Sequence, residues 1–238
     1  MTDTQEPTPL ELVIFGGAGG TGAAAVQTAL ARGHTVLSVD LALPDDPQDH
    51  PRLSHRAANV LNDDLAGAVR GADAVLSCLG VGNDPKTLVS PPPLYTDGTM
   101  AICDAMEKEG VKRLLVLSAS FVEERNRGPI WFKLPAMAAL HNVFDQMAEM
   151  EALLQKRARL SWTAVRPGWL MAGAATDDYT VQANVIPEDM IRTRRADLAD
   201  FMVKLAEGHE WVRRTPALAR KEDPSASSPQ AVAKEMLG

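Results

Sequence analysis

The sequence predicts a single doubly wound α/β domain, in which a parallel β-sheet is covered by helices on both faces. Short apolar segments alternate with helical segments from residue 10 to about residue 166, which is the pattern of a parallel sheet. These apolar segments are hydrophobic on both faces, as strands buried between two layers of helices are. Five of the 17 glycines lie within residues 16–22, between the first predicted strand and the first predicted helix.

The predicted strands are short apolar or β-branched runs that end at glycine, proline or a polar residue. They lie at residues 10–15, 35–39, around 56–58, 74–79, 112–117 and 162–166. The glycine cluster follows the first strand directly, and Asp40 stands at the end of the second. Because the carboxyl ends of parallel strands meet at one edge of a sheet, the residues that follow these strands are expected to form one site.

The predicted helices carry small or apolar residues at helical spacing, and several end at a glycine. They lie at residues 23–32, 63–70, 96–109, 137–154 and 196–207. Thr96 or Asp97 is the expected N-cap of the third helix. One face of the fourth helix carries an apolar residue at every third or fourth position, which predicts core packing or a homodimer interface. Its residues are Met137, Leu140, Phe144, Met147, Met150 and Leu154.

The segments outside the alternating pattern set the expected domain limits. Residues 1–9 are predicted to be a flexible leader, and residues 216–238 a weakly ordered C-terminal tail. The single domain spans residues 10–215. It includes two long loops, at residues 81–96 and 121–135, which we expect to determine the substrate.

The composition excludes several classes of protein. The hydrophobic fraction is 45% and the charged fraction 23%, which is ordinary for a globular domain. The formal net charge of −7 disfavours a nucleic-acid partner. No stretch approaches the roughly 18 apolar residues of a membrane span, and the acidic start lacks the features of a signal peptide. Two cysteines, Cys78 and Cys103, fit a reduced, cytoplasmic setting.

The glycine cluster has the spacing of a dinucleotide-binding loop. Gly16, Gly19 and Gly22 stand three residues apart, with a predicted strand before them and a predicted helix after them. Gly16 would permit a tight turn, Gly19 would let the backbone approach a pyrophosphate, and Gly22 would let the helix pack close to the sheet. The first helical turn then offers free N–H groups to phosphates. No Lys-Ser/Thr pair follows Gly22, so phosphoryl transfer from ATP is not expected.

Asp40 bears on the choice of cofactor. An acidic side chain at the end of the second strand accepts hydrogen bonds from the adenosine ribose hydroxyls. Its charge would repel a 2′-phosphate, and no Arg or Lys occurs between Gly33 and Arg52 to receive one. The sequence therefore favours NAD, with NADP as the alternative.

Seven short motifs occur in a fixed order over roughly residues 10–206. They are the run from Gly16 to Gly22, Ala72-Asp73-Ala74-Val75, Leu79-Gly80 with Asn83-Asp84, Gly110-Val111-Lys112-Arg113, Ser118-Ala119-Ser120-Phe121, Thr163-Ala164-Val165-Arg166-Pro167-Gly168 and Arg195-Ala196-Asp197-Leu198-Ala199. The set resembles the atypical short-chain dehydrogenases/reductases, and within them the NmrA-like and flavin reductase/biliverdin reductase B-type proteins. The resemblance implies a Rossmann-type fold that binds NAD(P).

The resemblance also implies which residues contact the cofactor. Phosphate contacts would come from Gly16, Ala18, Gly19, Gly20, Thr21 and Gly22. Asp40 would hold the ribose, and the adenine would be bordered by Asn59 and Val60. The middle and the nicotinamide end would be lined by Cys78, Leu79, Gly80, Ser118, Ala119, Ser120, Pro167, Gly168 and Trp169.

The chain departs from the family at its usual proton donor. Most members carry Tyr-x-x-x-Lys on the helix before the sixth strand, whereas neither residue occurs between Ala136 and Gln155. The chain has two tyrosines, Tyr95 and Tyr179. Flavin and biliverdin reductases of this branch also lack the pair, and they stack an acceptor against the nicotinamide so that hydride transfer occurs by proximity.

Four side chains are candidates for chemistry at the acceptor end. Ser118 and Ser120 would orient the acceptor or the nicotinamide, or would cap the end of the fifth strand. The phenol of Tyr95, the imidazole of His141 or solvent would supply a proton. A structural or exposed position is the alternative for His141.

Other reactive or aromatic residues have simpler expected roles. Trp131, Phe132 and Trp169 would form an apolar floor for a flat aromatic substrate, or would pack in the ordinary way. Cys78 is expected to be an inert thiol, because no His, Cys or basic residue adjoins it. The five histidines show no metal-ligand spacing, so no metal is expected.

These observations lead to one main hypothesis and two alternatives. The main hypothesis is an NAD(P)H-dependent oxidoreductase that transfers hydride to a small conjugated or aromatic acceptor, such as a quinone, a flavin, an enone or a polyketide-like metabolite. The first alternative is a non-catalytic, NmrA-like redox sensor that binds the dinucleotide without turning it over. The second is a non-redox isomerase or cyclase of secondary metabolism on the same fold.

Overall fold

The structure is a computed structural model that describes residues 8–82, 84–125, 130–228 and 230–231. Side chains are described for most of these residues, but not for residues 130–139. The predicted leader lies almost entirely outside the described residues. Among the helices of the described part, none combines the length and the hydropathy that a membrane span requires.

A central sheet runs through the described part of the chain, with the strand order β3-β2-β1-β4-β5-β6-β10-β8. In this order the strands are Leu53–Ala57, Thr35–Asp40, Glu11–Phe15, Ala74–Ser77, Arg113–Leu117, Ser161–Pro167, Pro216–Ala219 and Thr180–Ala183. Neighbours pair in parallel except β8, which pairs antiparallel with β10. The chain moves outward from β1 in both directions, so the strand order reverses between β1 and β4. A small parallel pair, β7 (Trp169–Met171) and β9 (Arg192–Arg194), lies outside this sheet.

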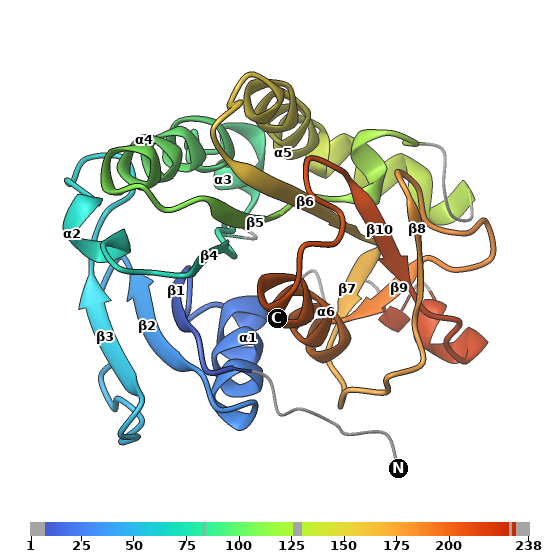
Figure 1. Cartoon of the computed structure of the whole chain (residues 1–238). Coiled ribbons are helices and arrows are strands. Elements are labelled where there is room, and N and C mark those ends of the chain that lie inside the picture. The colour runs from blue at the N-terminus through green and yellow to red at the C-terminus, as the bar shows by residue number, and fades with distance from the viewer. Residues whose placement is uncertain (1–7, 83, 126–129, 229, 232–238) are drawn as a thin grey trace, which may run out of the picture.

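Helices cover both faces of the central sheet (Figure 1). One face packs against α1 (Gly20–Ala31) and α6 (Arg195–Glu207). The other face packs against α2 (Ala66–Val69), α4 (Thr99–Glu109) and α5 (Ile130–Gln155). The short helix α3 (Pro85–Val89) and the π-helical turn η1 (Leu94–Gly98) lie beside α5. The predicted doubly wound parallel sheet with helices on both faces is therefore confirmed.

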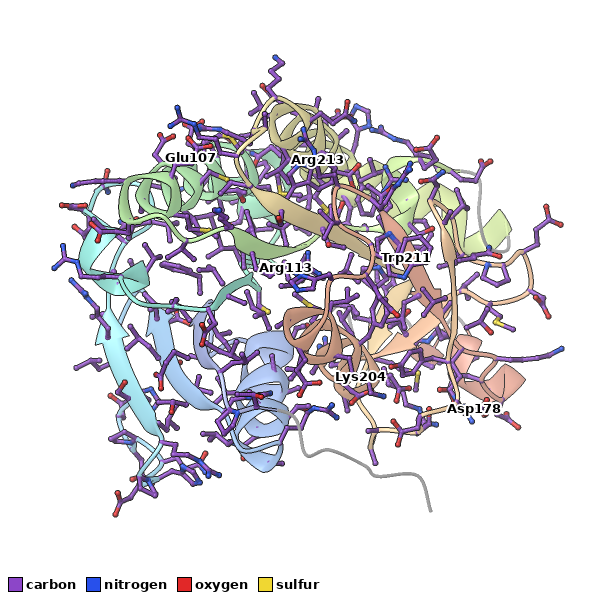
Figure 2. All side chains as sticks on the ribbon, in the orientation of Figure 1. Glu107, Arg113, Asp178, Lys204, Trp211 and Arg213 are labelled. Atoms are coloured by element: carbon purple, nitrogen blue, oxygen red, sulfur yellow. The ribbon has the colours of Figure 1, made fainter. Side chains whose placement is uncertain are left out.

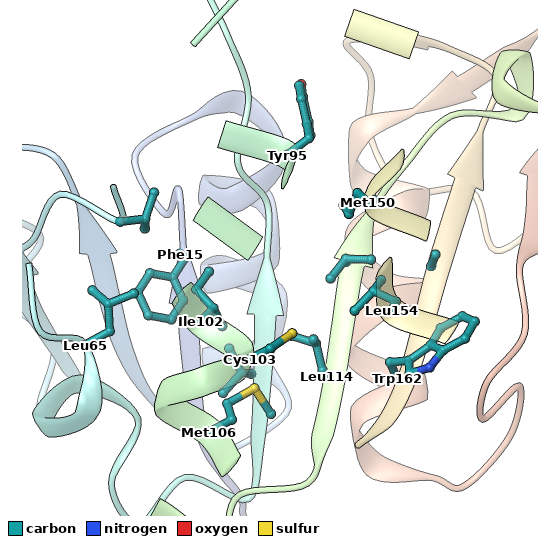
Figure 3. Close-up of a cluster of buried hydrophobic side chains, with 14 of the residues drawn as sticks. Phe15, Leu65, Tyr95, Ile102, Cys103, Met106, Leu114, Met150, Leu154 and Trp162 are labelled. Atoms are coloured by element: carbon teal, nitrogen blue, oxygen red, sulfur yellow. The ribbon is translucent and has the colours of Figure 1, made fainter. Parts of the chain in front are cut away.

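The alternation of side chains along β1 explains why residues 12–15 of this strand are all apolar. Val13 and Phe15 point into the core on the α4 and α5 side, whereas Leu12 and Ile14 point into the core on the α1 and α6 side. Successive side chains of a strand face opposite sides of the sheet, so a strand buried on both sides needs an apolar residue at every position. Figure 3 shows part of the first core, where Phe15 lies beside Leu65.

Arg113 fixes α6 to the sheet from inside the protein (Figure 2). This residue of β5 is 7% exposed, and its guanidinium donates hydrogen bonds to the carbonyl oxygens of Leu205 at 2.8 Å and Ser161 at 2.9 Å. Burial lowers the pKa of Arg113 to about 10, so the group stays charged at neutral pH. The end of α6 is thus held by charge-assisted hydrogen bonds.

Two predictions about the chain beyond β5 are wrong. Helix α5 begins at Ile130, inside the residues 121–135 that were expected to be loop, because a proline within a segment disfavours helix without excluding it. Residues 216–219 form the buried strand β10 between β6 and β8, although the weakly ordered tail was expected to start at residue 216. The sequence Pro-Ala-Leu-Ala has little intrinsic preference for strand, and its place between two strands decides its structure.

Candidate active site

A cavity of about 910 Å³ lies at the carboxyl ends of the parallel strands, across the point where the strand order reverses. Open α/β sheets bind their ligands at this position. The structure brings sixteen of the predicted cofactor residues together in its lining. They are Gly16, Ala18, Gly19, Gly20, Thr21, Asp40, Asn59, Val60, Cys78, Leu79, Gly80, Ser118, Ala119, Pro167, Gly168 and Trp169.

Gly16 and Gly22 shape the glycine loop by permitting contacts between backbones. Gly16 has a φ of +75°, and a Cβ at this residue would lie 2.6 Å from the carbonyl oxygen of Cys78. A Cβ at Gly22 would lie 2.0 Å from the carbonyl oxygen of Gly16. Gly22 does not line the cavity, so its role is to pack α1 against the loop rather than to contact a ligand.

The first turn of α1 is free to bind an anion. Its N-cap is Gly19, which has no side chain to accept a hydrogen bond, and the turn contains no acidic residue. The first N–H groups of a helix lack partners within the helix, and together with the helix dipole they attract phosphate. Gly20 and Thr21 carry this turn into the cavity lining.

Asp40 is held in place by two backbone groups at the end of β2. Its Oδ2 accepts a hydrogen bond from the Ala18 N–H at 2.9 Å, and its Oδ1 accepts one from the Leu41 N–H at 2.8 Å. The carboxylate therefore sits beside the glycine loop at the rim of the cavity. Each oxygen keeps a free lone pair, which suits the binding of a vicinal diol.

The turn after β3 forms the wall beyond Asp40. Asn59 stabilises this turn, because its Oδ1 accepts from the Leu61 N–H at 2.9 Å and its own N–H donates to Asp63 at 2.7 Å. Val60 and Leu61 add apolar surface to the same wall. This combination fits a flat heterocycle such as adenine.

Ser118 connects the cavity wall to a buried ion pair. Its Oγ donates a hydrogen bond to Glu151 Oε1 at 2.6 Å, and the same carboxylate receives Arg166 Nε at 2.9 Å. Glu151 is 4% exposed and Arg166 5% exposed. Burial alone would lower the pKa of Arg166, but its hydrogen bonds with Glu151 more than offset this and raise the pKa. Because the Ser118 proton is directed to Glu151, any further hydrogen bond of its oxygen with a ligand would be made as an acceptor.

Tyr95 lines the cavity from η1 rather than from a loop. The side chain is 5% exposed, and burial raises the pKa of its phenol to about 12. The phenol is therefore protonated at neutral pH and keeps a hydrogen that it can donate. The neighbouring thiol of Cys78 behaves similarly, because burial raises its pKa to about 12 and keeps it neutral.

The structure does not bring Ser120 or His141 to the cavity, so the expectation that they act there is corrected. Ser120 is fully buried, and its Oγ accepts a hydrogen bond from the Ile186 N–H at 3.0 Å. The His141 side chain is 60% exposed and pairs with Asp145 at 3.0 Å. One residue along a helix turns a side chain by about 100°, so His141 points away although Leu140 lines the cavity.

The apolar face of α5 has two roles along its length. Its first part lines the cavity through Leu140, Phe144 and Met147, whereas Met150 and Leu154 are buried in the core. The prediction of core packing or a dimer interface therefore does not account for the part of this face that lines the cavity. Trp169 also lines the cavity. The side chains of Trp131 and Phe132, expected to form an apolar floor, lie outside the described residues.

Two residues of the site were not singled out from the sequence. Glu151 belongs to no motif, and only its contact with Ser118 identifies it. Arg195 lines the cavity beside the glycine loop, and it stands in one of the seven motifs, but the sequence assigned it no role. Within the described residues, no three His, Cys, Asp or Glu side chains gather as a metal-binding group.

A family model described as NAD(P)H-binding matches residues 16–208, which is well over half of the chain. The chain therefore belongs to the NAD(P)H-binding family, and the resemblance recognised in its motifs is confirmed at this level. The UPF0659 protein YMR090W of Saccharomyces cerevisiae is 25% identical over 173 residues, which cover 70% of either chain.

Solved structures share the fold. The oxidoreductase ylbE from Lactococcus lactis superposes with a TM-score of 0.73 at 19% identity, over 96% of this chain and 98% of the other. ChuY, an anaerobillin reductase from Escherichia coli O157:H7, superposes with a TM-score of 0.67 at 23% identity, over 90% of this chain and 98% of the other. At these identities the likeness establishes the Rossmann-type fold.

The buried ion pair behind Ser118 gives a testable stability prediction. Glu151→Leu removes the buried carboxylate from Arg166, which keeps the exposed Glu123 at 3.0 Å and the Asn184 carbonyl oxygen at 2.9 Å, and should cost up to about 3–5 kcal/mol of unfolding free energy. The double variant Glu151→Leu/Arg166→Met removes both charges and should recover most of that loss. Urea denaturation of the wild type, Glu151→Leu, Arg166→Met and the double variant measures this, and a double variant as unstable as the sum of both single variants would contradict it.

Proposed function

We propose that this protein is an NAD(P)H-dependent oxidoreductase that reduces a small, flat, conjugated acceptor. The observation that carries the proposal is a single cavity that joins the glycine loop to an apolar region beyond Ser118. The first part suits a dinucleotide, and membership of the NAD(P)H-binding family supports that occupant. The second part leaves room for an acceptor next to it.

The residues of the loop and the strand ends would hold the cofactor. The first-turn N–H groups of α1 bind the phosphates, Asp40 accepts from the adenosine ribose, and Ser118 accepts from the carboxamide N–H. When bound, the reduced nicotinamide supplies a hydride to the acceptor. The protein contributes by holding the acceptor close and by excluding water from it.

The lining of the acceptor region favours a neutral substrate. Among the described lining residues, the charged side chains are Asp40 and Arg195, and both stand at the glycine-loop end. Leu140, Phe144 and Met147 supply the opposite wall. A quinone, an enone or another uncharged conjugated ring fits such a surface, because a charged group there would lose its hydration without gaining a partner.

Tyr95 is the proposed proton donor. The Ser118 proton is directed to Glu151, and His141 is exposed outside the cavity. The protonated phenol of Tyr95 remains in the lining. Solvent is the alternative source, and a variant distinguishes the two.

The first prediction concerns turnover. The wild-type protein should oxidise NADH with a quinone or enone acceptor, and Gly19→Asp should abolish this. Gly19 has an extended N-cap conformation (φ −71°, ψ 160°), in which aspartate is a favoured residue, so the variant should fold. Its carboxylate would occupy the first-turn N–H groups and repel phosphate. Absorbance at 340 nm across an acceptor panel measures the rate.

Two results of that panel would contradict the proposal. Equal rates for the wild type and Gly19→Asp would show that the oxidation does not use this loop. Tight NADH binding without turnover of any acceptor would instead favour the redox sensor, which the missing Tyr-x-x-x-Lys pair keeps in consideration. Product formation at a constant cofactor redox state would favour the isomerase or cyclase.

Asp40 should determine the preference for NADH over NADPH. In Asp40→Ala, the repulsion of a 2′-phosphate disappears, so the ratio of the NADPH Kd to the NADH Kd should fall about tenfold, or 1.4 kcal/mol. Fluorescence titration with both cofactors measures the ratio. Asp45→Ala is the matched control, because it removes the same charge from an exposed residue outside the cavity lining. An unchanged ratio in Asp40→Ala would contradict the assignment.

Tyr95→Phe tests the proton donor. If the phenol donates the proton, kcat should fall by about 10²–10⁴-fold, while the NADH Kd should change less than about twofold. Because the pKa of Tyr95 is about 12, the phenol is fully protonated from pH 6 to pH 9, and the ratio of wild-type to variant kcat should stay constant over that range. A variant with wild-type kcat would mean that solvent supplies the proton.

A further inference from the structure

Arg195 is a cation inside the cavity, directly over the start of α1. It is the first residue of α6 and belongs to the cavity lining. A Cβ built on Gly20 would lie 3.1 Å from both Cδ and Nε of Arg195 and 3.8 Å from its Cζ. The guanidinium arm therefore covers the first residue of α1, at the position where the phosphate-binding N–H groups begin.

Among the described residues, Arg195 takes part in no ion pair or hydrogen bond, although carboxylates stand close to it in sequence. Its neighbour Arg194 is fully engaged, because Nε and Nη2 bond both oxygens of Glu222 at 2.6 and 2.9 Å. Asp197 is engaged by Thr176, whose N–H and hydroxyl both donate to it. The Arg195 guanidinium is half-buried in the cavity lining, where a ligand can supply the acceptor that the described side chains do not.

The only other charged side chain in the described lining is Asp40, and its two oxygens already accept from the Ala18 and Leu41 N–H groups. It forms no ion pair with Arg195 in the structure, and its remaining lone pairs are the ones assigned to the ribose hydroxyls. The cavity thus presents one unpaired positive charge beside the glycine loop. A pyrophosphate, with a negative charge on each phosphate, matches that charge and that place.

We propose that Arg195 binds the pyrophosphate of the dinucleotide and closes over it from the α6 side, opposite the N–H groups of α1. The planar guanidinium donates two parallel hydrogen bonds to a pair of phosphate oxygens, which a lysine cannot do. This inference rests on the proposed binding of a dinucleotide at the glycine loop. A Cβ at Gly20 would require the guanidinium arm to shift by a few tenths of an ångström.

The assignment separates the role of Arg195 from that of Asp40. Arg195 would contact a group that NADH and NADPH share, so its loss should weaken both cofactors by the same factor. Asp40 would contact the ribose that differs between them, so its loss should change their ratio. The two residues therefore leave different signatures in one set of titrations.

The test is a set of binding titrations with NADH, NADPH, ADP and adenosine, the last two as competitors of NADH fluorescence. Arg195→Gln should weaken NADH, NADPH and ADP by about 10–100-fold, as expected when a charge-assisted contact is lost. Adenosine, which carries no phosphate, should bind within twofold of the wild type. Arg195→Lys keeps the charge without the fork and should recover part of the affinity.

Arg159→Gln is the matched control. It removes the same charge from an exposed residue just before the amino end of β6, at the edge of the sheet opposite the cavity. It should leave all four affinities unchanged. A far-UV circular dichroism spectrum and a melting temperature for each variant verify that the fold is intact.

Three outcomes would overturn the inference. Unchanged ADP and NADH affinities in Arg195→Gln would mean that the side chain does not reach the pyrophosphate. Equal losses for ADP and adenosine would mean that the substitution disturbs the cavity rather than a phosphate contact. A folded wild type that binds neither NADH nor NADPH would remove the proposed function together with this inference, whereas the first two outcomes leave that function in place.

Discussion

The close approach of backbone to backbone at the start of α1 is the constraint on which the rest of the site depends. Any Cβ at Gly22 would lie 2.0 Å from the Gly16 carbonyl oxygen, and any Cβ at Gly16 would lie 2.6 Å from that of Cys78. Glycine alone removes both conflicts, and at Gly16 it also accepts the positive φ. The ends of β1 and β4 and the start of α1 therefore meet with no side chain between them, which brings the first-turn N–H groups of α1 to the switch point of the sheet.

Helix α6 depends on the same arrangement. It packs along α1, and its last turns are fixed to β5 by the guanidinium of Arg113. The carboxyl end of α6 is fixed in this way, and its amino end places Arg195 against Gly20. Helix α6, which is distant from the glycine loop in sequence, thus places a positive charge beside that loop. On the opposite face of the sheet, α5 contributes Glu151, which fixes the Ser118 hydroxyl from behind.

The sequence was sufficient for the parts of the molecule in which local pattern and burial agree. Strands β1, β2, β4, β5 and β6 are apolar because both faces of the sheet are covered, and the glycine spacing marks the turn after β1. Strands β8 and β10 escaped prediction because each has four residues. The residues of β10 also have little strand preference, so its pairing with β6 and β8 defines it. His141 was misjudged because its neighbour Leu140 does line the cavity, and only the phase of the helix separates the two. Glu151 and Arg195 contact residues that are distant in sequence, Ser118 and Gly20, and no local sequence pattern predicts such contacts.

The charged lining residues gather at one end of the cavity, so its two ends would bind their ligands through different interactions. The described charged lining residues, Asp40 and Arg195, both stand at the glycine-loop end, whereas Leu140, Phe144 and Met147 line the other end. In the first half, binding depends on fixed donors, acceptors and charges, which recognise one kind of molecule. In the second half it depends on shape and apolar area, which admit any flat ring of suitable size. Such a division suits a reductase whose cofactor is strictly defined and whose acceptor is selected by fit, because an apolar pocket discriminates only weakly among rings of similar size.

The missing Tyr-x-x-x-Lys pair agrees with this division. In the proposed reaction, an acceptor that is already conjugated would need close contact with the nicotinamide more than a strong acid, and the buried phenol of Tyr95 in the cavity lining would supply the proton.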